Sequence, residues 1–139
     1  MQNKCIRFIL DLGPRSHIGS KEFKLANMLP VQDRVRQLNL NHVFKIFHNQ
    51  CPEYMKEKFL RIRDTPLRLC TRSSTNNLFL PRVTKQAIHS FFFSGIKDWN
   101  ALPSLIKENN NEMTFKSKIK DHIFNELENK ESSNFVYYV

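Results

Sequence analysis

The sequence contains little glycine: Gly13, Gly19 and Gly95 are the whole supply in a chain of 139 residues. Phosphate-cradling loops and dinucleotide fingerprints need several glycines at fixed spacing, so neither can be built here. The sequence also lacks clustered carboxylates, because no two acidic residues are adjacent and no Asp-x-Asp occurs. Two-metal phosphoryl transfer depends on carboxylates that hold the cations. Local polymerase and nuclease motifs are therefore absent.

Paired cysteines and long apolar runs are missing as well. Cys5, Cys51 and Cys70 are far apart and form no Cys-x-x-Cys, so neither a zinc ribbon nor a redox pair is predicted. No stretch approaches the roughly 18 apolar residues of a membrane-spanning helix. Arg7 and Asp11 interrupt the apolar residues of the N-terminal segment, unlike a secretory signal. We expect reduced thiols, no cofactor, no metal, no membrane contact and a nuclear or cytoplasmic location.

Positive charge is abundant and uneven. The formal net charge is +9, and residues 1–72 carry 14 Lys and Arg against 6 Asp and Glu. Residues 101–139 carry 5 against 6, so the basic excess lies in the first half of the chain. Such asymmetry favours a polyanionic partner, above all nucleic acid. The alternative is that these cations only solvate helix faces.

Apolar spacing predicts one mainly α-helical domain over residues 1–139, with a loop-rich middle and at most a short β-hairpin or edge strand. Gly13 is expected to end the first helix in a left-handed conformation, and Ser20 and Thr114 are expected to cap later helices. Residues 61–77 are expected to form a flexible basic loop and residues 130–139 a frayed tail. Helices are predicted over residues 2–12, 21–28, 31–48, 52–60, 85–101 and from 114 onward.

The longest periodic run, residues 31–48, has two neighbouring apolar stripes that together predict a broad core-facing surface. The first stripe begins with Val31, Val35 and Leu38, and the second consists of Leu40, Phe44 and Phe47.

A basic segment over residues 56–72 is the best candidate for a binding site. Four of its six cations are arginine, which favours bidentate contact with phosphate, and each phosphate neutralised releases counterions. A solvated helix end and loop is the competing interpretation. The candidate nucleic-acid-binding residues are Lys56, Lys58, Arg61, Arg63, Arg68 and Arg72, followed by Arg82 and Lys85.

The aromatic residues after this segment favour packing over chemistry. Ile88, Phe92, Ile96 and Trp99 recur at helical spacing, which predicts that the Phe91–Phe93 triplet faces the core instead of stacking on bases. Trp99, Asn100 and Pro103 are interpreted as structural anchors. The amide of Asn100 can satisfy backbone groups at the helix end.

Enzymatic chemistry finds little support in this sequence. His42 and His48 point about 240° apart on a helix and form no metal-binding pair. A Cys51–His48 nucleophile pair is formally possible, but nothing marks either residue as activated. Of the functions considered, a stand-alone hydrolase or transferase therefore ranks last, because the sequence contains no motif for it.

An ordered series of motifs resembles the C-terminal region of reverse transcriptases from non-LTR retrotransposons, the jockey-like and related LINE-type elements. The series includes LPVQDRVRQLNLNHVFKI, CPEYM, TRSS, LFLPRV, SFFFSGIKDWNALPSLIK and FKSKIKDHIF, and it covers nearly the whole chain. The combination of TR, a proline-bearing apolar segment, W-N-x-L-P and F-K-x-x-(I/L)-K is distinctive.

The resemblance implies an accessory part of an RNA-directed DNA polymerase that contacts RNA or DNA and the upstream polymerase domains. It implies no catalysis within this chain, because the palm and endonuclease motifs would lie upstream of Met1, and the chain is then expected to be a fragment. A purely structural buttress of the polymerase thumb, without direct nucleic-acid contact, is the alternative.

Overall fold

The computed structural model describes residues 1–62 and 76–135, with side chains described up to residue 131. The described chain is mainly helical, which confirms the predicted fold class. Its residues group into two compact units, one formed by Met1–Val35 with Ser117–Val139 and the other by Arg36–Lys116. Most of the sequence-predicted loop, residues 63–75, lies outside the described residues.

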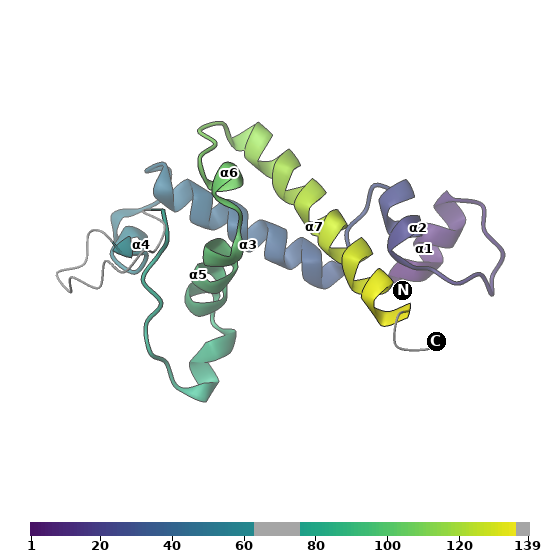
Figure 1. Cartoon of the computed structure of the whole chain (residues 1–139), viewed down its shortest axis with the longest axis horizontal. Helices are drawn as coiled ribbons and strands as arrows, with labels where there is room; N and C mark the ends of the chain where they lie inside the picture. The colour runs from purple at the N-terminus through teal and green to yellow at the C-terminus, as the bar shows by residue number, and fades with distance from the viewer. Residues whose placement is uncertain (63–75, 136–139) are drawn as a thin grey trace. The chain divides into compact units, whose positions relative to one another are not determined.

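The first unit contains helices α1 (Gln2–Ile9) and α2 (Ser20–Leu25) and most of α7 (Glu112–Phe135) (Figure 1). Its buried side chains come from all three helices and from the loop after α2. They are Ile6, Phe23, Leu29, Ile119, Ile123 and Phe124.

Side-chain hydrogen bonds join the parts of this unit that are distant in sequence. Glu131 of α7 accepts a hydrogen bond from the backbone N–H of Ser20 at 2.7 Å and another from the Ser20 hydroxyl. Lys24 forms an ion pair with Glu128 at 2.8 Å. These contacts join the start of α2 and Lys24 to the last turns of α7. Residues 130–135, which were expected to belong to a frayed tail, are part of this helix.

Three helices of the chain end in the same way, and the expected role of Gly13 is wrong. Asp11, Asn27 and Asn49 follow α1, α2 and α3 (Val31–Phe47) with φ of 51°, 53° and 58°. No glycine in the chain has positive φ, Gly13 included. Short polar side chains tolerate the left-handed conformation, so a glycine is not needed to terminate these helices.

The second unit contains most of α3, the short helix α4 (Glu53–Lys56), the 3₁₀ helix η2 (Lys85–His89), α5 (Phe91–Ala101), α6 (Ser104–Lys107) and the first turn of α7. Its core is rich in aromatic rings, as Phe44 stacks on Phe115 with centroids 4.1 Å apart and Phe47 stacks on Trp99 at 4.7 Å. The buried apolar residues are Leu40, Val43, Phe44, Ile46, Phe59, Leu78, Ile96, Trp99, Leu102, Ile106 and Phe115.

Helix α3 presents one of its two predicted apolar stripes to the core. Leu40 and Phe44 are fully buried, whereas Val31, Val35 and Leu38 are 63%, 51% and 43% exposed. The prediction of a single broad core face was therefore wrong for the first stripe. Beside the buried stripe, the polar residues Gln37 and Asn41 are also buried, and the Gln37 side chain donates to the Lys116 carbonyl at 3.3 Å.

Gly95 allows α5 to lie close to α3. A Cβ atom at this position would meet a methyl group of Val43 at 3.2 Å, closer than most real contacts allow. The helical cost of glycine is therefore offset by close helix packing. Ser90 caps the same helix by accepting a hydrogen bond from the Phe93 N–H at 3.4 Å, which separates η2 from α5 within the predicted helix 85–101.

Two predicted caps are shifted in the structure. Ser20 is the first residue of α2, and Gly19 is its N-cap. Helix α7 begins at Glu112, and the Asn111 side chain accepts hydrogen bonds from the Met113 and Thr114 N–H groups at 2.8 and 3.4 Å. In the described ranges, no helix has the length and apolar character to cross a membrane.

Candidate nucleic-acid interface

Lys56 ends α4, Lys58 lies on the turn that follows it, and Arg61 comes just beyond, in the bridge to Leu78. Residues 56–61 are here called the anchored turn. The turn is fixed by hydrogen bonds from Lys58 N–H to the Met55 carbonyl and from Phe59 N–H to the Lys56 carbonyl. The Phe59 side chain between the cations is buried at 6% exposure. Because Phe59 anchors the turn to the core, Lys56, Lys58 and Arg61 are held near the surface, where Lys58 is exposed and the other two are half-buried.

Two of these cations lie over aromatic rings. The Lys58 ammonium is 4.7 Å from the centroid of Phe92, and the Arg61 guanidinium carbon is 4.6 Å from the centroid of Phe47. A cation over a ring face gains about 0.5–1 kcal/mol at an exposed site. The contact also restricts the side chain while leaving its N–H donors available to a ligand, which lowers the entropy lost on binding.

None of the three cations forms an ion pair with a carboxylate within the part of the chain that the structure describes. Other lysines do form such pairs, as Lys45 and Lys116 both contact Glu112. Lys56, Lys58 and Arg61 therefore have no direct carboxylate partner among the described residues.

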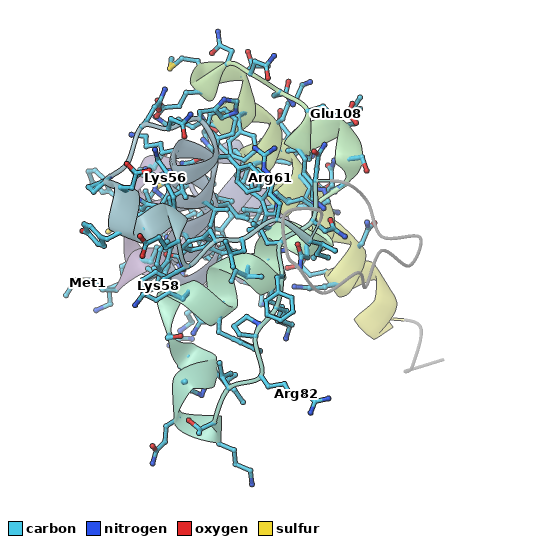
Figure 2. The ribbon with its side chains drawn as sticks, turned by 90° about the vertical axis from the view of Figure 1, so that its left-hand side faces the viewer. Met1, Lys56, Lys58, Arg61, Arg82 and Glu108 are labelled. Atoms are coloured by element: carbon cyan, nitrogen blue, oxygen red, sulfur yellow. The ribbon has the colours of Figure 1, made fainter. Side chains whose placement is uncertain are left out.

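The remaining predicted site residues do not join this group. Arg82 and Lys85 are exposed on the extended segment before η2 and at its start. Figure 2 shows Arg82 well apart from Lys56 and Arg61. Arg63, Arg68 and Arg72 lie outside the described residues. The structure therefore brings together three of the eight predicted cations, with two more at a distance.

The phenylalanine triplet packs against the same turn. Phe91 and Phe92 are half-buried, and their ring centroids lie 5.7 and 5.6 Å from that of Phe59. Lys58 covers the Phe92 ring. The two rings pack against Phe59 and support the anchored turn. They take part in packing, but none of the three phenylalanines belongs to the buried core, and Ile88 of the predicted stripe is 41% exposed.

Trp99 and Asn100 attach the segment 76–78 to the end of α5. Trp99 is 1% exposed, and its indole N–H donates to the Asn76 carbonyl at 3.0 Å. The Asn100 amide pairs twice with the backbone of Leu78, accepting from its N–H at 2.8 Å and donating to its carbonyl at 2.9 Å. Asn100 was expected to serve its own helix end, but it binds a separate extended segment.

This segment has two hydrogen-bonding edges. On one edge, Asn77 and Phe79 bond with the backbone of residues 60–62, forming an isolated antiparallel bridge between Arg61 and Leu78. On the other edge, the Leu78 backbone meets the Asn100 amide, which has the same donor and acceptor as a peptide group. The Asn100 side chain therefore takes the place of a neighbouring strand and fixes the backbone position of Arg61 through Leu78.

Pro103 separates α5 from α6 and places Lys107. Pro103 precedes the first residue of α6, and its carbonyl accepts from the Ile106 and Lys107 N–H groups. Lys107 is 8% exposed, and its ammonium donates to the Asn77 side-chain oxygen at 2.9 Å and to the Asn100 carbonyl at 3.1 Å.

Burial lowers the pKa of the Lys107 ammonium below its ordinary value of 10.5. Between the lowered pKa and 10.5 the unfolded chain binds more protons than the folded chain, so stability contributed by Lys107 should rise with pH in that interval. Arg61, His48 and Glu108 line the same cleft and are retained in a Lys107→Gln variant, so the comparison of the two proteins isolates Lys107. Urea unfolding of both proteins from about pH 7 to about pH 10 should show that the free energy of unfolding of the wild type rises relative to that of the variant. Parallel stability curves would contradict this assignment.

Sequence reasoning did not predict the burial of Lys107, the place of His48 in this cleft or the stacking of Phe47 on Trp99. Lys107 follows Leu105 and Ile106 in a short segment after Pro103, where a lysine is ordinarily solvated. The structure buries Ile106 and Lys107 and leaves Leu105 74% exposed. A four-residue helix has too few positions to show a periodic pattern, so the sequence carried no signal for this burial.

The described residues contain no group of three His, Cys, Asp or Glu side chains that could hold a metal ion. Comparison with known proteins finds no matching family model, curated protein or solved structure.

Proposed function

We propose that this chain is a catalytically inert, C-terminal part of a non-LTR retrotransposon RNA-directed DNA polymerase that contacts RNA or DNA phosphates. The resemblance of its ordered motifs, W-N-x-L-P above all, supports the family. The observation that carries the phosphate contact is the set of Lys56, Lys58 and Arg61, which have no carboxylate partner among the described residues and lie on one anchored turn. Upstream polymerase domains are the expected protein partner.

A triple variant tests this proposal. Lys56→Gln, Lys58→Gln and Arg61→Gln together remove about three phosphate contacts, and a single-strand salt slope of about −0.7 per contact then predicts roughly 100-fold weaker binding at about 0.1 M salt. The measurement is fluorescence anisotropy with labelled single-stranded RNA and DNA oligonucleotides. The salt slope itself should decrease by about 2.

A matched control separates a local site from net charge. Lys4, Lys21 and Lys130 are exposed lysines of the first unit, and their replacement by Gln gives the same total charge as the triple variant. The control should bind nearly as tightly as the wild type. Equal weakening in both variants would reduce the interaction to general electrostatic attraction, and no binding by the wild type would refute the proposal.

The structural buttress is the second candidate. It is favoured by the W-N-x-L-P residues, because the contacts of Trp99 and Asn100 are with this chain's own backbone. It predicts that the triple variant leaves any nucleic-acid affinity of the chain unchanged.

A further inference from the structure

Lys107 is a buried cation whose hydrogen-bond partners among the described residues are all neutral. It is 8% exposed, and its two acceptors are an amide oxygen of Asn77 and the backbone carbonyl of Asn100. No ion pair joins its ammonium to a carboxylate of the described chain. Removing an ammonium from water without an opposite charge is costly. An anion bound beside Lys107 would offset this cost.

Lys107 lines a cleft with two further groups that favour an anion. The cleft has a volume of about 170 Å³, and Arg61 and His48 also line it. The Arg61 guanidinium is held over Phe47, and the His48 ring lies against Phe44 with centroids 4.2 Å apart. Asn76 and Asn110 add amide groups to the lining, and the wall contains Phe47 and Trp99. The Arg61 and His48 side chains are therefore oriented by ring packing, and Lys107 by its hydrogen bonds, before any ligand arrives.

We propose that this cleft, here called the Lys107 cleft, binds a phosphoryl group of a nucleic acid, with Lys107 and Arg61 as its cationic donors. An ammonium retains a third N–H after its two neutral hydrogen bonds, and a guanidinium can bind two phosphate oxygens in parallel. Pockets for drug-sized ligands begin at about 300 Å³, so the cleft fits one small tetrahedral anion and not a whole nucleotide. This inference rests on the proposed function and assigns one of its phosphate contacts to a built site.

Glu108 opposes the anion and so provides a test. Its carboxylate lines the same cleft but is exposed, as Figure 2 shows for the labelled side chain near α6. Two cations and one carboxylate leave a net positive lining, and the carboxylate repels a phosphate at the rim. Replacing Glu108 by Gln should therefore tighten anion binding. A purely structural role of Glu108 would not produce tighter binding.

The phosphoryl group has two sources in a nucleic acid. A terminal monoester carries up to two charges and can enter a recessed cleft end-on, whereas an internal diester carries one charge and enters with the chain on both sides. Two oligonucleotides of the same sequence, one with a 5′-phosphate and one with a 5′-hydroxyl, distinguish these sources. If the wild type prefers the phosphorylated strand and Lys107→Gln loses this preference, the terminal phosphate is the ligand. If the wild type binds both strands equally and Lys107→Gln binds both equally more weakly, the backbone phosphate is the ligand.

The direct experiment titrates the whole chain with inorganic phosphate. Trp99 is the chain's only tryptophan and lines the cleft, so its fluorescence reports on occupancy, and phosphorus-31 line broadening provides a second readout. We expect saturable binding by about 10 mM, a range that fills a millimolar site. Lys107→Gln should bind at least about tenfold more weakly, and Glu108→Gln several-fold more tightly. Exposed Lys97, which is not part of the lining, supplies the control Lys97→Gln with wild-type affinity.

Three results would overturn the inference. These are a wild-type chain without saturable phosphate binding, a folded Lys107→Gln variant with unchanged affinity, or a Glu108→Gln variant that binds more weakly. If Lys107→Gln does not fold, the other two variants still decide the question, because Glu108→Gln should bind phosphate more tightly and Arg61→Gln more weakly. Salt-dependent oligonucleotide binding without phosphate binding would reject the cleft and leave the proposed function intact. Phosphate binding that depends on Lys107, together with unchanged oligonucleotide affinity when Lys56 and Lys58 alone are replaced by Gln, would retain the cleft and reject the contacts of those two lysines.

Discussion

Replacing Trp99 by alanine is expected to lower the free energy of unfolding by about 3–5 kcal/mol, the usual cost of truncating a large buried aromatic side chain. The ring is 1% exposed and lies against Phe47 and Phe115, at centroid distances of 4.7 and 5.9 Å. Truncation leaves a cavity between these rings and removes the hydrogen bond to the Asn76 carbonyl. Because domains of this size are stable by about 5–15 kcal/mol, the variant should be largely unfolded at modest urea concentrations.

Two further substitutions make this result interpretable. Trp99→Phe keeps most of the apolar contact and loses the indole donor, so it should cost less than the alanine variant, about 1–3 kcal/mol. Leu105 lies close in sequence but is 74% exposed, and Leu105→Ala should stay within about 0.5 kcal/mol of the wild type. Urea unfolding followed by far-ultraviolet circular dichroism measures all three. A Trp99→Ala variant within about 1 kcal/mol of the wild type would show that Trp99 is not a core anchor.

Replacing Asn100 by alanine is expected to cost about 2–4 kcal/mol, because both polar groups of the Leu78 backbone lose their partner. Leu78 is fully buried, so water cannot readily replace the amide. The loss should also release the segment 76–78 from α5 and with it the bridge to Arg61. Amide hydrogen exchange at Leu78 should then accelerate more than exchange at residues of α3.

The matched control for Asn100 is Gln86, an exposed amide of η2. Gln86→Ala should be nearly neutral in stability and in exchange at Leu78. If Asn100→Ala shows the same small effect as the control, the amide does not act as a substitute strand. A destabilised variant with unchanged exchange at Leu78 would place the loss elsewhere in α5.

The sequence predicted the helical elements because their signals are local. The buried spacing of Phe115, Ile119 and Ile123 in α7 follows directly from helical periodicity. The same reasoning overestimated the core face of α3, because Gln37 and Asn41 are buried beside its true stripe. Periodicity identifies apolar residues that share a face, but only tertiary packing decides which face is covered.

The candidate site was less accessible to sequence reasoning. Local charge density drew attention to Lys56, Lys58 and Arg61, which lie close together in the chain, and to the more distant Arg82 and Lys85. Contacts between segments far apart in the chain carry no such signal. Asn100 with Leu78, and Lys107 with Asn77, are separated by 22 and 30 positions, so their pairing depends on how α5 and α6 fold back over the extended segment.

The central claim is that the cations of the anchored turn contact nucleic-acid phosphates, and chemical-shift mapping tests it most directly. A ¹⁵N-labelled chain titrated with a single-stranded oligonucleotide at low salt should show its largest shifts at Lys56, Lys58 and Arg61. The indole N–H of Trp99, beside the Lys107 cleft, should shift with them. Shifts confined to α1 and α2, or no shifts at oligonucleotide excess, would contradict the account.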